Sequence, residues 1–304
     1  MKPLHVAVLM GGTSTEREVS LNSGRMVAEA LRRAGGMTIS EVDVRGPEFV
    51  LPRGVDVAFI AMHGLFGEDG HVQQILEDRG VPYTGSDASA SAVAFDKILA
   101  KECFVAAGIP TPDFVVLDGD LSAVEEMRWP LFVKPARQGS SVGISKVANR
   151  EELIQAREKA RKYDGEILVE EFVKGRELTV GVLGGRALPV IEIRTDHGFF
   201  DYDAKYTKGG AIEEVAELEP AVVARVQALA VRAHECLSCR DVSRVDVMLR
   251  EDGQMFVLEV NTIPGMTENS LLPKAAKAAG ISMETLCRKL VEMAWARRGE
   301  LVAA

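Results

Sequence analysis

Residues 241–261, with the sequence DVSRVDVMLREDGQMFVLEVN, decide the fold because they predict a β-hairpin that is charged on one face. The dipeptide Asp252-Gly253 favours a two-residue turn, which fixes the pairing of the strands on either side. Side chains alternate between the two faces of a strand, so one face is polar and the other apolar. The polar face pairs Asp246 with Glu259 and Arg244 with Asn261. The apolar face carries Val245, Val247, Leu258 and Val260.

Two carboxylates directly opposite each other repel, so the polar face of this hairpin predicts a bound cation. Carboxylate and amide oxygens are ligands that Mg²⁺ accepts, usually beside substrate phosphates. We therefore expect a magnesium–nucleotide site at Asp246, Glu259 and Asn261. The alternative is a solvated edge hairpin whose charges face water. The irregular segment 262–271 favours the ligand interpretation, because loops after strand ends often hold substrates.

The composition of the chain excludes several classes of function. Its 304 residues predict two or three domains, and 47% hydrophobic with 27% charged residues is typical of a globular protein. A formal net charge of −9 argues against a nucleic-acid or anionic-membrane surface. No apolar run approaches the ~18 residues of a membrane span. Four scattered cysteines fit a reducing compartment, so we expect a cytoplasmic protein.

Residues 1–95 predict a small α/β domain with a mostly parallel sheet. A strand at Val6–Met10 ends in Gly11-Gly12 and leads into a helical pattern, and later strands alternate with a helix. The glycine pair lacks the dinucleotide spacing G-x-G-x-x-G, so we expect a substrate-facing loop. His63 also follows a strand, and we expect it to contact a ligand, although histidines at strand ends are often structural.

Residues 96–178 and 179–304 predict two further modules. The first begins with a helix at Lys97 and continues with strands at 114–117, 131–134, 142–147 and 166–173, separated by helices near 121–127 and 150–162. The second continues with strands to Arg194, a helix at 220–237, the hairpin and a last amphipathic helix.

Lys134 ends a strand and precedes a Gly139-Ser140-Ser141 loop, an arrangement that suits a polyphosphate. Backbone amides of such a loop and a lysine ammonium can cradle phosphate oxygens. The order of a Walker A loop is missing, and an ordinary Gly-Ser turn is the alternative.

Two further segments point to a nucleotide and a lid. The strand ending at Phe172 and Val173 could hold a planar base in an inter-domain crevice, with Glu177 near the ribose, or it could be a surface hairpin. The long loop 196–210 is typical of a lid, with Lys205 and Tyr206 as its working residues.

Taken together, these motifs resemble the D-alanine–D-alanine ligases of the ATP-grasp superfamily, and the resemblance runs from end to end of the chain. It implies an α/β (α+β) fold of three domains at 1–95, 96–178 and 179–304, with ATP between the last two. The motifs are Gly11-Gly12-Thr-Ser-Thr-Glu16, Lys97, Lys134 with Gly139-Ser140-Ser141, Glu170 to Glu177, Ala204-Lys205-Tyr206, Arg244-x-Asp246 and Glu259-Val-Asn261-Thr-x-Pro-Gly265.

The resemblance also implies roles for individual residues. A Glu16–Ser140–Tyr206 triad would organise the amino-acid site, with His63 near the first D-alanine and Ser270-Leu271 at the carboxylate of the second. Arg244 and the Gly265 amide would stabilise an oxyanion. Asp246 and Glu259 would hold one Mg²⁺, and Glu259 with Asn261 a second, with Mn²⁺ as a substitute. The ATP contacts would be Lys97, Lys134, Ser141, Lys205, Glu170, Glu171, Phe172, Val173 and Glu177.

The implied activity is the ATP-dependent joining of two D-alanine molecules through a D-alanyl phosphate, for peptidoglycan synthesis, by a homodimer. The nearest alternative is another ATP-grasp carboxylate–amine ligase or a depsipeptide (D-Ala–D-Lac) ligase, and Tyr206 favours an amine nucleophile. An ATP-binding regulatory protein is a second alternative. A nicotinamide oxidoreductase is disfavoured by the missing glycine fingerprint. Ser243, where glycine is frequent in the family, is a departure.

Overall fold

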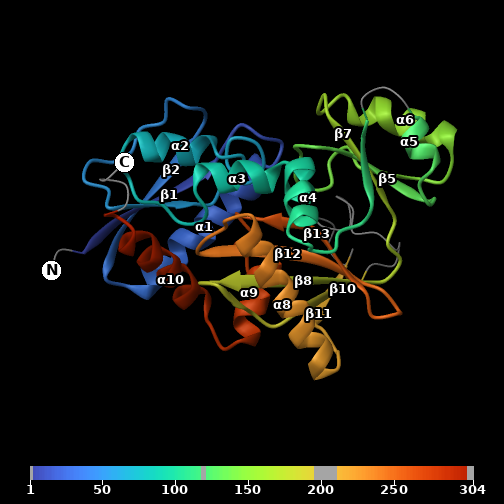
Figure 1. The fold of residues 1–304 in the computed structure, drawn as a ribbon. Coiled ribbons are helices and arrows are strands. Elements are labelled where there is room, and N and C mark those ends of the chain that lie inside the picture. Colours follow the sequence, from blue (N-terminus) through green and yellow to red (C-terminus); the bar gives the residue numbers. More distant parts are fainter. Residues whose placement is uncertain (1–2, 118–120, 195–210, 300–304) are drawn as a thin grey trace.

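The computed structural model describes residues 3–117, 121–194 and 211–299, and its strands form three sheets (Figure 1). One sheet belongs to the N-terminal part, one to the central part and one to the C-terminal part. The strands are β1 Leu4–Gly11, β2 Met37–Val44, β3 Val57–Ile60, β4 Phe114–Leu117, β5 Leu131–Pro135, β6 Ser145–Val147, β7 Ile167–Glu171, β8 Arg176–Leu183, β9 Arg186–Ala187, β10 Ile191–Arg194, β11 Ile212–Val215, β12 Val242–Leu249 and β13 Met255–Asn261.

The helices cover these sheets and connect them. They are α1 Arg17–Ala34, α2 His71–Asp78, α3 Ala88–Phe95, α4 Lys97–Ala106, α5 Ser122–Glu125, α6 Arg150–Ala160, α8 Pro220–Cys236, α9 Leu271–Ala278 and α10 Met283–Ala296. None of the helices among the described residues has the length and apolar character needed to cross a membrane.

The N-terminal sheet has the order β2-β1-β3, and both pairings are parallel, as the sequence predicts. Its middle strand β1 is buried on both faces from Val6 to Leu9, which is usual for a parallel strand covered by helices. The chain leaves β1 through Gly11 and Gly12, both at a left-handed φ of 92°. Glycine adopts this conformation without the penalty of a Cβ, and the turn leads directly into α1.

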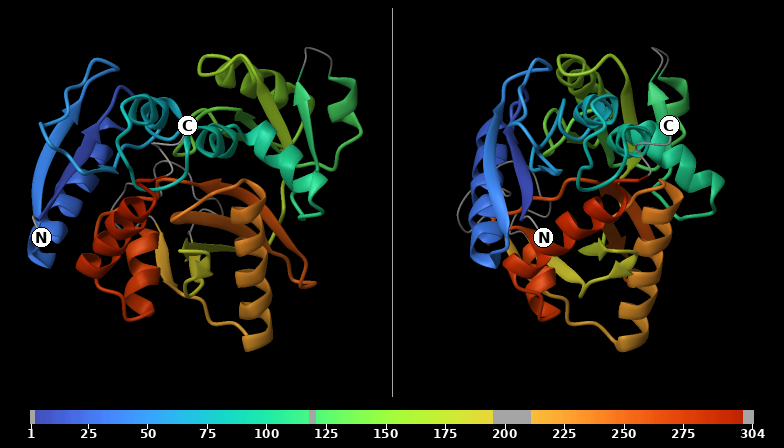
Figure 2. Two further views of the ribbon diagram at one scale, coloured as in Figure 1. Left: turned by 60° about the vertical axis from the view of Figure 1, so that its left-hand side comes forward. Right: turned by 90° about the vertical axis from the view of Figure 1, so that its left-hand side faces the viewer.

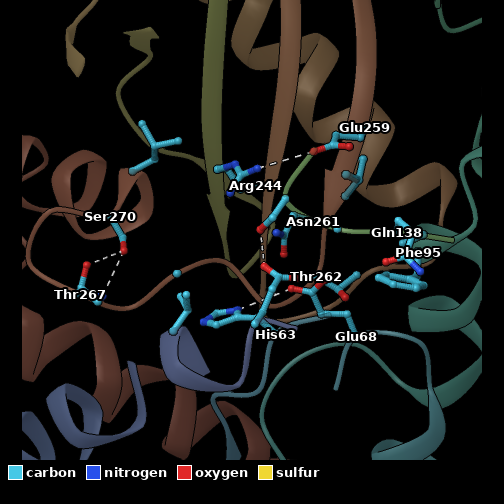
Figure 3. A pocket seen from close by; sticks show the side chains of 18 of the residues that line it. His63, Glu68, Phe95, Gln138, Arg244, Glu259, Asn261, Thr262, Thr267 and Ser270 are labelled. Atoms are coloured by element: carbon cyan, nitrogen blue, oxygen red, sulfur yellow. Dashed lines mark hydrogen bonds and ion pairs between the residues drawn. The ribbon is translucent and has the colours of Figure 1, made fainter. Parts of the chain in front are cut away.

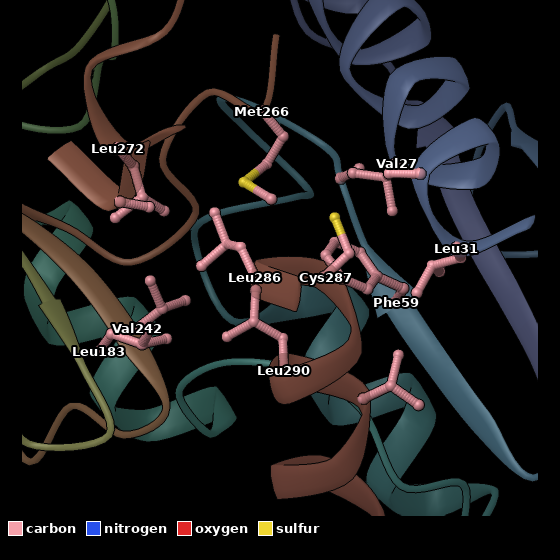
Figure 4. Packing of buried hydrophobic residues seen from close by; sticks show 14 of the residues in the cluster. Val27, Leu31, Phe59, Leu183, Val242, Met266, Leu272, Leu286, Cys287 and Leu290 are labelled. Atoms are coloured by element: carbon pink, nitrogen blue, oxygen red, sulfur yellow. The ribbon is translucent and has the colours of Figure 1, made fainter. Parts of the chain in front are cut away.

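A shared hydrophobic core joins the N-terminal sheet to the C-terminal sheet (Figure 4). Val27 and Leu31 of α1 pack with Leu286 and Leu290 of α10, and Leu272 of α9 belongs to the same cluster. Residues from opposite ends of the sequence therefore fix the relative position of these two sheets. The last amphipathic helix, expected from the sequence, is the element that makes this connection.

The C-terminal sheet contains the decisive hairpin, in the strand order β11-β10-β8-β12-β13. The predicted pairs of Arg244 with Asn261 and Asp246 with Glu259 are both present. The predicted two-residue turn is wrong, because Arg250 N–H donates to Gln254 O at 2.9 Å and Gly253 takes a left-handed φ of 82°. The turn therefore has three residues and shifts the register by one residue.

A β-bulge compensates for this longer turn. The register shifts between Asp246 and Val247, so that Val247 pairs with Val257. Leu258 is the extra residue of the bulge and does not lie in the core with the valines, contrary to the prediction. Val257, fully buried, takes its place. The bulge restores the expected pairing at the polar end of the hairpin.

The central sheet has the order β4-β7-β5-β6 and is antiparallel. It has its own core, formed with α6, and Figure 2 shows it standing apart from the N-terminal sheet. The predicted strand 142–147 is too long, because residues 142 and 143 belong to a turn and β6 begins at Ser145. Two helices, α3 and α9, were not predicted. The domain division at residues 95 and 178 stays a prediction.

Candidate active site

A cavity of about 580 Å³ is lined by side chains from distant parts of the sequence (Figure 3). Side chains from the N-terminal, central and C-terminal parts all line it. Of the predicted site residues, the cavity wall includes Glu16, His63, Lys97, Ser140, Arg244, Glu259, Asn261, Gly265, Ser270 and Leu271. The predicted residues that lie behind or outside this wall are Lys134, Ser141, Asp246, Glu170, Glu171, Phe172, Val173 and Glu177.

Arg244 and Asp246 form a bidentate ion pair on the polar face of the hairpin. Arg244 Nε donates to Asp246 Oδ1 at 2.9 Å, and Nη2 donates to Oδ2 at 2.7 Å. Burial alone would lower the pKa of Arg244, but Asp246 raises it above its usual range. Nη1 of Arg244 donates to no described residue. One edge of the guanidinium thus remains available at the cavity.

Thr179 on the neighbouring strand β8 also fixes Asp246. The two residues are paired across the strands, and the Thr179 hydroxyl donates to Asp246 Oδ1 at 2.6 Å. Both side chains are buried. The sequence interpretation assigned no role to Thr179, because only the pairing of β8 with β12 reveals it.

The donor set of the hairpin suits a hard cation. Glu259 Oε1 lies 3.8 Å from Arg244 Nη2, and the Glu259 side chain is more exposed than that of Asp246. Asn261 Oδ1 accepts from Ile263 N–H at 2.8 Å, which orients the amide. In the parts of the chain that the structure describes, no cluster of three or more His, Cys, Asp or Glu side chains could hold a metal. Two acids and an amide match Mg²⁺ that shares its coordination with phosphate oxygens.

Glu16 and Ser140 come from distant parts of the sequence and are in direct contact at the cavity wall. The Ser140 hydroxyl donates to Glu16 Oε1. Gly139 makes room for this contact, because a Cβ there would lie 2.6 Å from Glu16 Oε2. The loop also bends sharply, with left-handed φ values of 50° at Ser140 and 60° at Ser141. The third predicted triad member, Tyr206, lies outside the described residues, as does Lys205.

His63 is a buried wall residue with a partner on each ring nitrogen. Its Nδ1 lies 3.0 Å from Ile263 O and 3.5 Å from Glu68 Oε1, while its Nε2 lies 2.9 Å from Ser23 Oγ. Burial alone would lower the pKa of His63, but Glu68 raises it above the ordinary histidine value. Glu68, also buried, was quoted in the sequence but given no role.

The segment after β13 brings Gly265, Ser270 and Leu271 to the cavity. Ser270 precedes α9, and its Oγ lies 2.8 Å from Thr267 Oγ1 (Figure 3). A Cβ on Gly265 would lie 2.7 Å from Ser270 Oγ, so a side chain at this position would displace the Ser270 hydroxyl. The N-terminus of a helix presents free backbone N–H groups, which favour a carboxylate. This end of the cavity therefore suits the carboxylate of a substrate.

The predicted phosphate lysines reach the site from two elements. Lys97 is the first residue of α4, and its Nζ donates to Gln138 O at 2.5 Å in the loop that carries Ser140. Lys134 on β5 is buried and forms an ion pair with Glu170. Gln138, a further cavity residue, was not singled out from the sequence.

The predicted adenine segment follows β7. Glu171 Oε1 accepts from Arg128 N–H at 2.9 Å, so its side chain is held by a neighbouring turn. Phe172 packs edge to face on Phe132 with ring centroids 5.8 Å apart, and Lys146 Nζ lies 3.5 Å from the Phe172 ring centroid. Val173 and Glu177 are partly exposed. Glu170 differs, because its side chain is buried and forms ion pairs with two lysines, Lys101 and Lys134.

The cavity combines an acid–amide hairpin with a Gly-Ser loop that a lysine of α4 contacts, and this arrangement fits an ATP-dependent ligase of the ATP-grasp fold. Comparison with known proteins narrows this class. Residues 104–292 match the family model described as D-ala D-ala ligase C-terminus, and residues 47–86 match D-ala D-ala ligase N-terminus. The chain belongs to the D-alanine–D-alanine ligase family.

Individual relatives agree with this family along their whole length. The D-alanine–D-alanine ligase of Methylacidiphilum infernorum is 47% identical over 297 residues, which is 97% of either chain. The solved D-alanine–D-alanine ligase of Bacillus anthracis complexed with ATP has a TM-score of 0.84 and 33% identity, with 98% of this chain and 99% of that chain covered. The VanG D-Ala:D-Ser ligase of Enterococcus faecalis has a TM-score of 0.86 and 32% identity, with 96% and 99% covered.

Proposed function

We propose that this protein joins two molecules of D-alanine into D-alanyl-D-alanine with the conversion of ATP to ADP and phosphate. The observation that carries the proposal is the contact of Ser140 with Glu16 in a cavity whose opposite wall carries Arg244, Glu259 and Asn261. One wall then offers amino-acid contacts, and the other offers a cation site. The product serves peptidoglycan synthesis, and the enzyme works as a homodimer in the cytoplasm.

The first step needs an activated carboxylate, since a carboxylate does not react with an amine directly. One carboxylate oxygen of the first D-alanine attacks the γ-phosphate of ATP, which gives D-alanyl phosphate and ADP. Lys97, Lys134 and Lys205 hold the phosphates. Ser141, in the loop after β5, also contacts ATP. Asp246 with Glu259, and Glu259 with Asn261, would hold two Mg²⁺ ions, or Mn²⁺ in their place. Such ions would neutralise charge on the phosphate oxygens.

In the second step the neutral amine of the second D-alanine attacks the carbonyl of D-alanyl phosphate; the nitrogen loses a proton, the C–O bond to the phosphate breaks, and inorganic phosphate leaves as the peptide bond forms. The free Nη1 of Arg244 and the N–H of Gly265 stabilise the oxyanion, a contribution of commonly ~3 kcal/mol for each donor. Ser270 and Leu271 bind the second carboxylate. His63 lies beside the first D-alanine, and Glu16, Ser140 and Tyr206 organise the amino-acid site.

The base and ribose of ATP lie along the segment after β7. Glu170, Glu171, Phe172 and Val173 contact the adenine, and Glu177 contacts the ribose.

The test is incubation with ATP, Mg²⁺ and D-alanine, with D-lactate and D-serine added in parallel, and identification of the products by mass. We expect D-alanyl-D-alanine as the main product. A depsipeptide or a D-Ala–D-Ser product would favour a related ligase, an alternative supported by the similarity to the VanG D-Ala:D-Ser ligase. Binding of ATP without release of phosphate would contradict an enzymatic role.

A further inference from the structure

Lys101 on α4 is a buried lysine to which no step of the proposed reaction assigns a role. Its side chain is 1% exposed, and its Nζ lies 2.5 Å from Thr111 Oγ1, 3.2 Å from Pro112 O and 3.1 Å from Glu170 Oε2. The Phe114 ring lies 5.1 Å from the same ammonium. Burial of an ammonium is costly unless it is paired, so this position requires an explanation.

Glu170 lies between Lys101 and a second lysine, Lys134. The register of the central sheet causes this arrangement, because Glu170 pairs with Phe132 and Lys134 is two residues further along β5 on the same face. Lys134 binds Glu170 Oε1, and Lys101 lies beside Oε2. Burial alone would raise the pKa of Glu170, but the two ammonium groups hold it below its usual range.

With both lysines protonated, the row of three side chains carries one excess positive charge; burial lowers the pKa of Lys101, and the carboxylate of Glu170 opposes this effect. If Lys101 were absent, Glu170 and Lys134 would form a neutral pair, and the site would offer less charge to a phosphate. We infer that Lys101 is a positioning residue for the nucleotide, which neutralises Glu170 from behind so that the charge of Lys134 remains available to the phosphates of ATP. This inference rests on the proposed function, in which Lys134 contacts ATP.

The same lysine also joins the central sheet to the strand with the cation ligands. Thr111, which holds the Lys101 ammonium, donates from its hydroxyl to Val257 O at 2.8 Å. Val257 N–H donates to Pro110 O, also at 2.8 Å. Val257 lies on β13 two residues before Glu259. Lys101 therefore lies at the contact between the proposed phosphate lysine and the proposed cation site.

The test compares Lys101→Met, which removes the charge at similar length, with Lys101→Arg, which keeps it. Dissociation constants are measured for ADP, which carries phosphates, and for adenosine, which does not. For Lys101→Met we expect the constant for ADP to rise at least about tenfold and that for adenosine to change less than about twofold. Lys101→Arg should retain most of the preference for ADP, and the KM for D-alanine should change little in either variant.

An equal loss of affinity for ADP and adenosine would show that the ion pair is merely structural and would overturn the inference. Unchanged affinity for both ligands would overturn it too. If Lys101→Met does not fold, Thr111→Val replaces it, because it removes the hydroxyl partner and leaves the ammonium in place. This variant should weaken the binding of ADP more than that of adenosine. Equal effects on the two dissociation constants would also overturn the inference. Failure of the unmodified protein to bind ADP would instead contradict the proposed function itself.

Discussion

The two walls of the cavity are built by different means. The wall formed by β12 and β13 comes from residues that are adjacent in the sequence, and a sheet with a buried apolar face fixes its side chains. The wall formed by residues 138–141 is a loop with left-handed backbone at Ser140 and Ser141, and its partner Glu16 is 124 residues away in the sequence. A sheet positions functional groups through register, whereas a loop requires distant partners to do so.

The largest effect should follow from loss of a cation ligand in the sheet wall. Glu259→Gln and Asp246→Asn each remove a carboxylate charge while they keep the size of the side chain. We expect kcat to fall on the order of 10³-fold, because charge on the transferring phosphate is no longer neutralised. Steady-state kinetics at several Mg²⁺ concentrations checks this.

The matched control is Asp252→Asn, in the exposed turn at the other end of the same hairpin. It should leave kcat within about twofold, since surface changes have small effects. Full activity of both ligand variants would contradict the cation assignment. A large fall in melting temperature would show instead that the acids only stabilise the hairpin.

The sheet wall should also show a specific loss of stability in acid. Behind β12, His234 Nδ1 lies 2.7 Å from Ser243 Oγ, and burial lowers the pKa of His234 to about 4. An unfolded histidine has a pKa near 6.5, so below that pH the unfolded state binds a proton that the folded state does not. Stability from this group is therefore present above about pH 6.5 and is lost as the pH falls towards 4, by on the order of 3 kcal/mol.

Urea unfolding of the wild type and of His234→Gln between pH 7.5 and 4.5 measures this loss. As the pH falls, the free energy of unfolding of the wild type should decrease more than that of His234→Gln. His63 contributes a pH dependence of stability of the opposite sign, because Glu68 raises its pKa in the folded state. Both proteins contain His63, so comparing them at each pH removes its contribution. A difference that does not vary with pH would contradict the prediction.

The loop wall can be broken with a single methyl group. Gly139→Ala places a Cβ against Glu16 and should displace its carboxylate from Ser140. We expect kcat/KM for D-alanine to fall roughly 30-fold, equivalent to about 2 kcal/mol, with a smaller change in the KM for ATP. Steady-state kinetics with D-alanine and ATP varied in turn separates the effect on D-alanine from the effect on ATP.

Gly165→Ala is the control for this loop variant, because nothing lies within 4 Å of a Cβ at that position. Its kinetics should match the wild type. If Gly139→Ala behaves in the same way, the contact of Glu16 with the loop does not contribute to substrate binding.

The smallest effect should come from the residue that supports Asp246 from the next strand. Thr179→Val removes the hydroxyl that donates to Asp246, whereas Thr179→Ser retains it. We expect a loss of about 1 kcal/mol in unfolding free energy for valine and less for serine, since a buried acceptor loses one donor. Thermal unfolding of the two variants gives the comparison, and equal stability of both would contradict it.

The sequence predicted the sheet wall better than the loop wall. The pairs of Arg244 with Asn261 and Asp246 with Glu259 were correct even though the turn was wrong, because the bulge at Leu258 offsets the three-residue turn. Gly253 fits the third position of a three-residue turn as well as a two-residue turn, and the bulge has no distinct sequence signal. The departure at Ser243 has a physical account in the structure, since the buried hydroxyl is paired with His234.

The elements and residues that were missed share a dependence on tertiary structure. Helix α3 is rich in alanine and serine and lacks a periodic apolar stripe, and α9 carries Pro273 in its first turn, where proline is tolerated. The roles of Lys101, Glu68 and Thr179 depend on partners in other elements, so no local pattern reveals them. Lys205 and Tyr206 lie outside the described residues, and their roles stay predictions.

The most direct test of the central claim follows oxygen atoms through the reaction. D-alanine labelled with ¹⁸O in its carboxylate is incubated with unlabelled ATP and Mg²⁺ in ordinary water, and the inorganic phosphate is analysed by mass spectrometry. A D-alanyl phosphate intermediate transfers one carboxylate oxygen to phosphorus, so we predict one ¹⁸O atom in each phosphate released with the dipeptide. Unlabelled phosphate would contradict the mechanism assigned to this cavity.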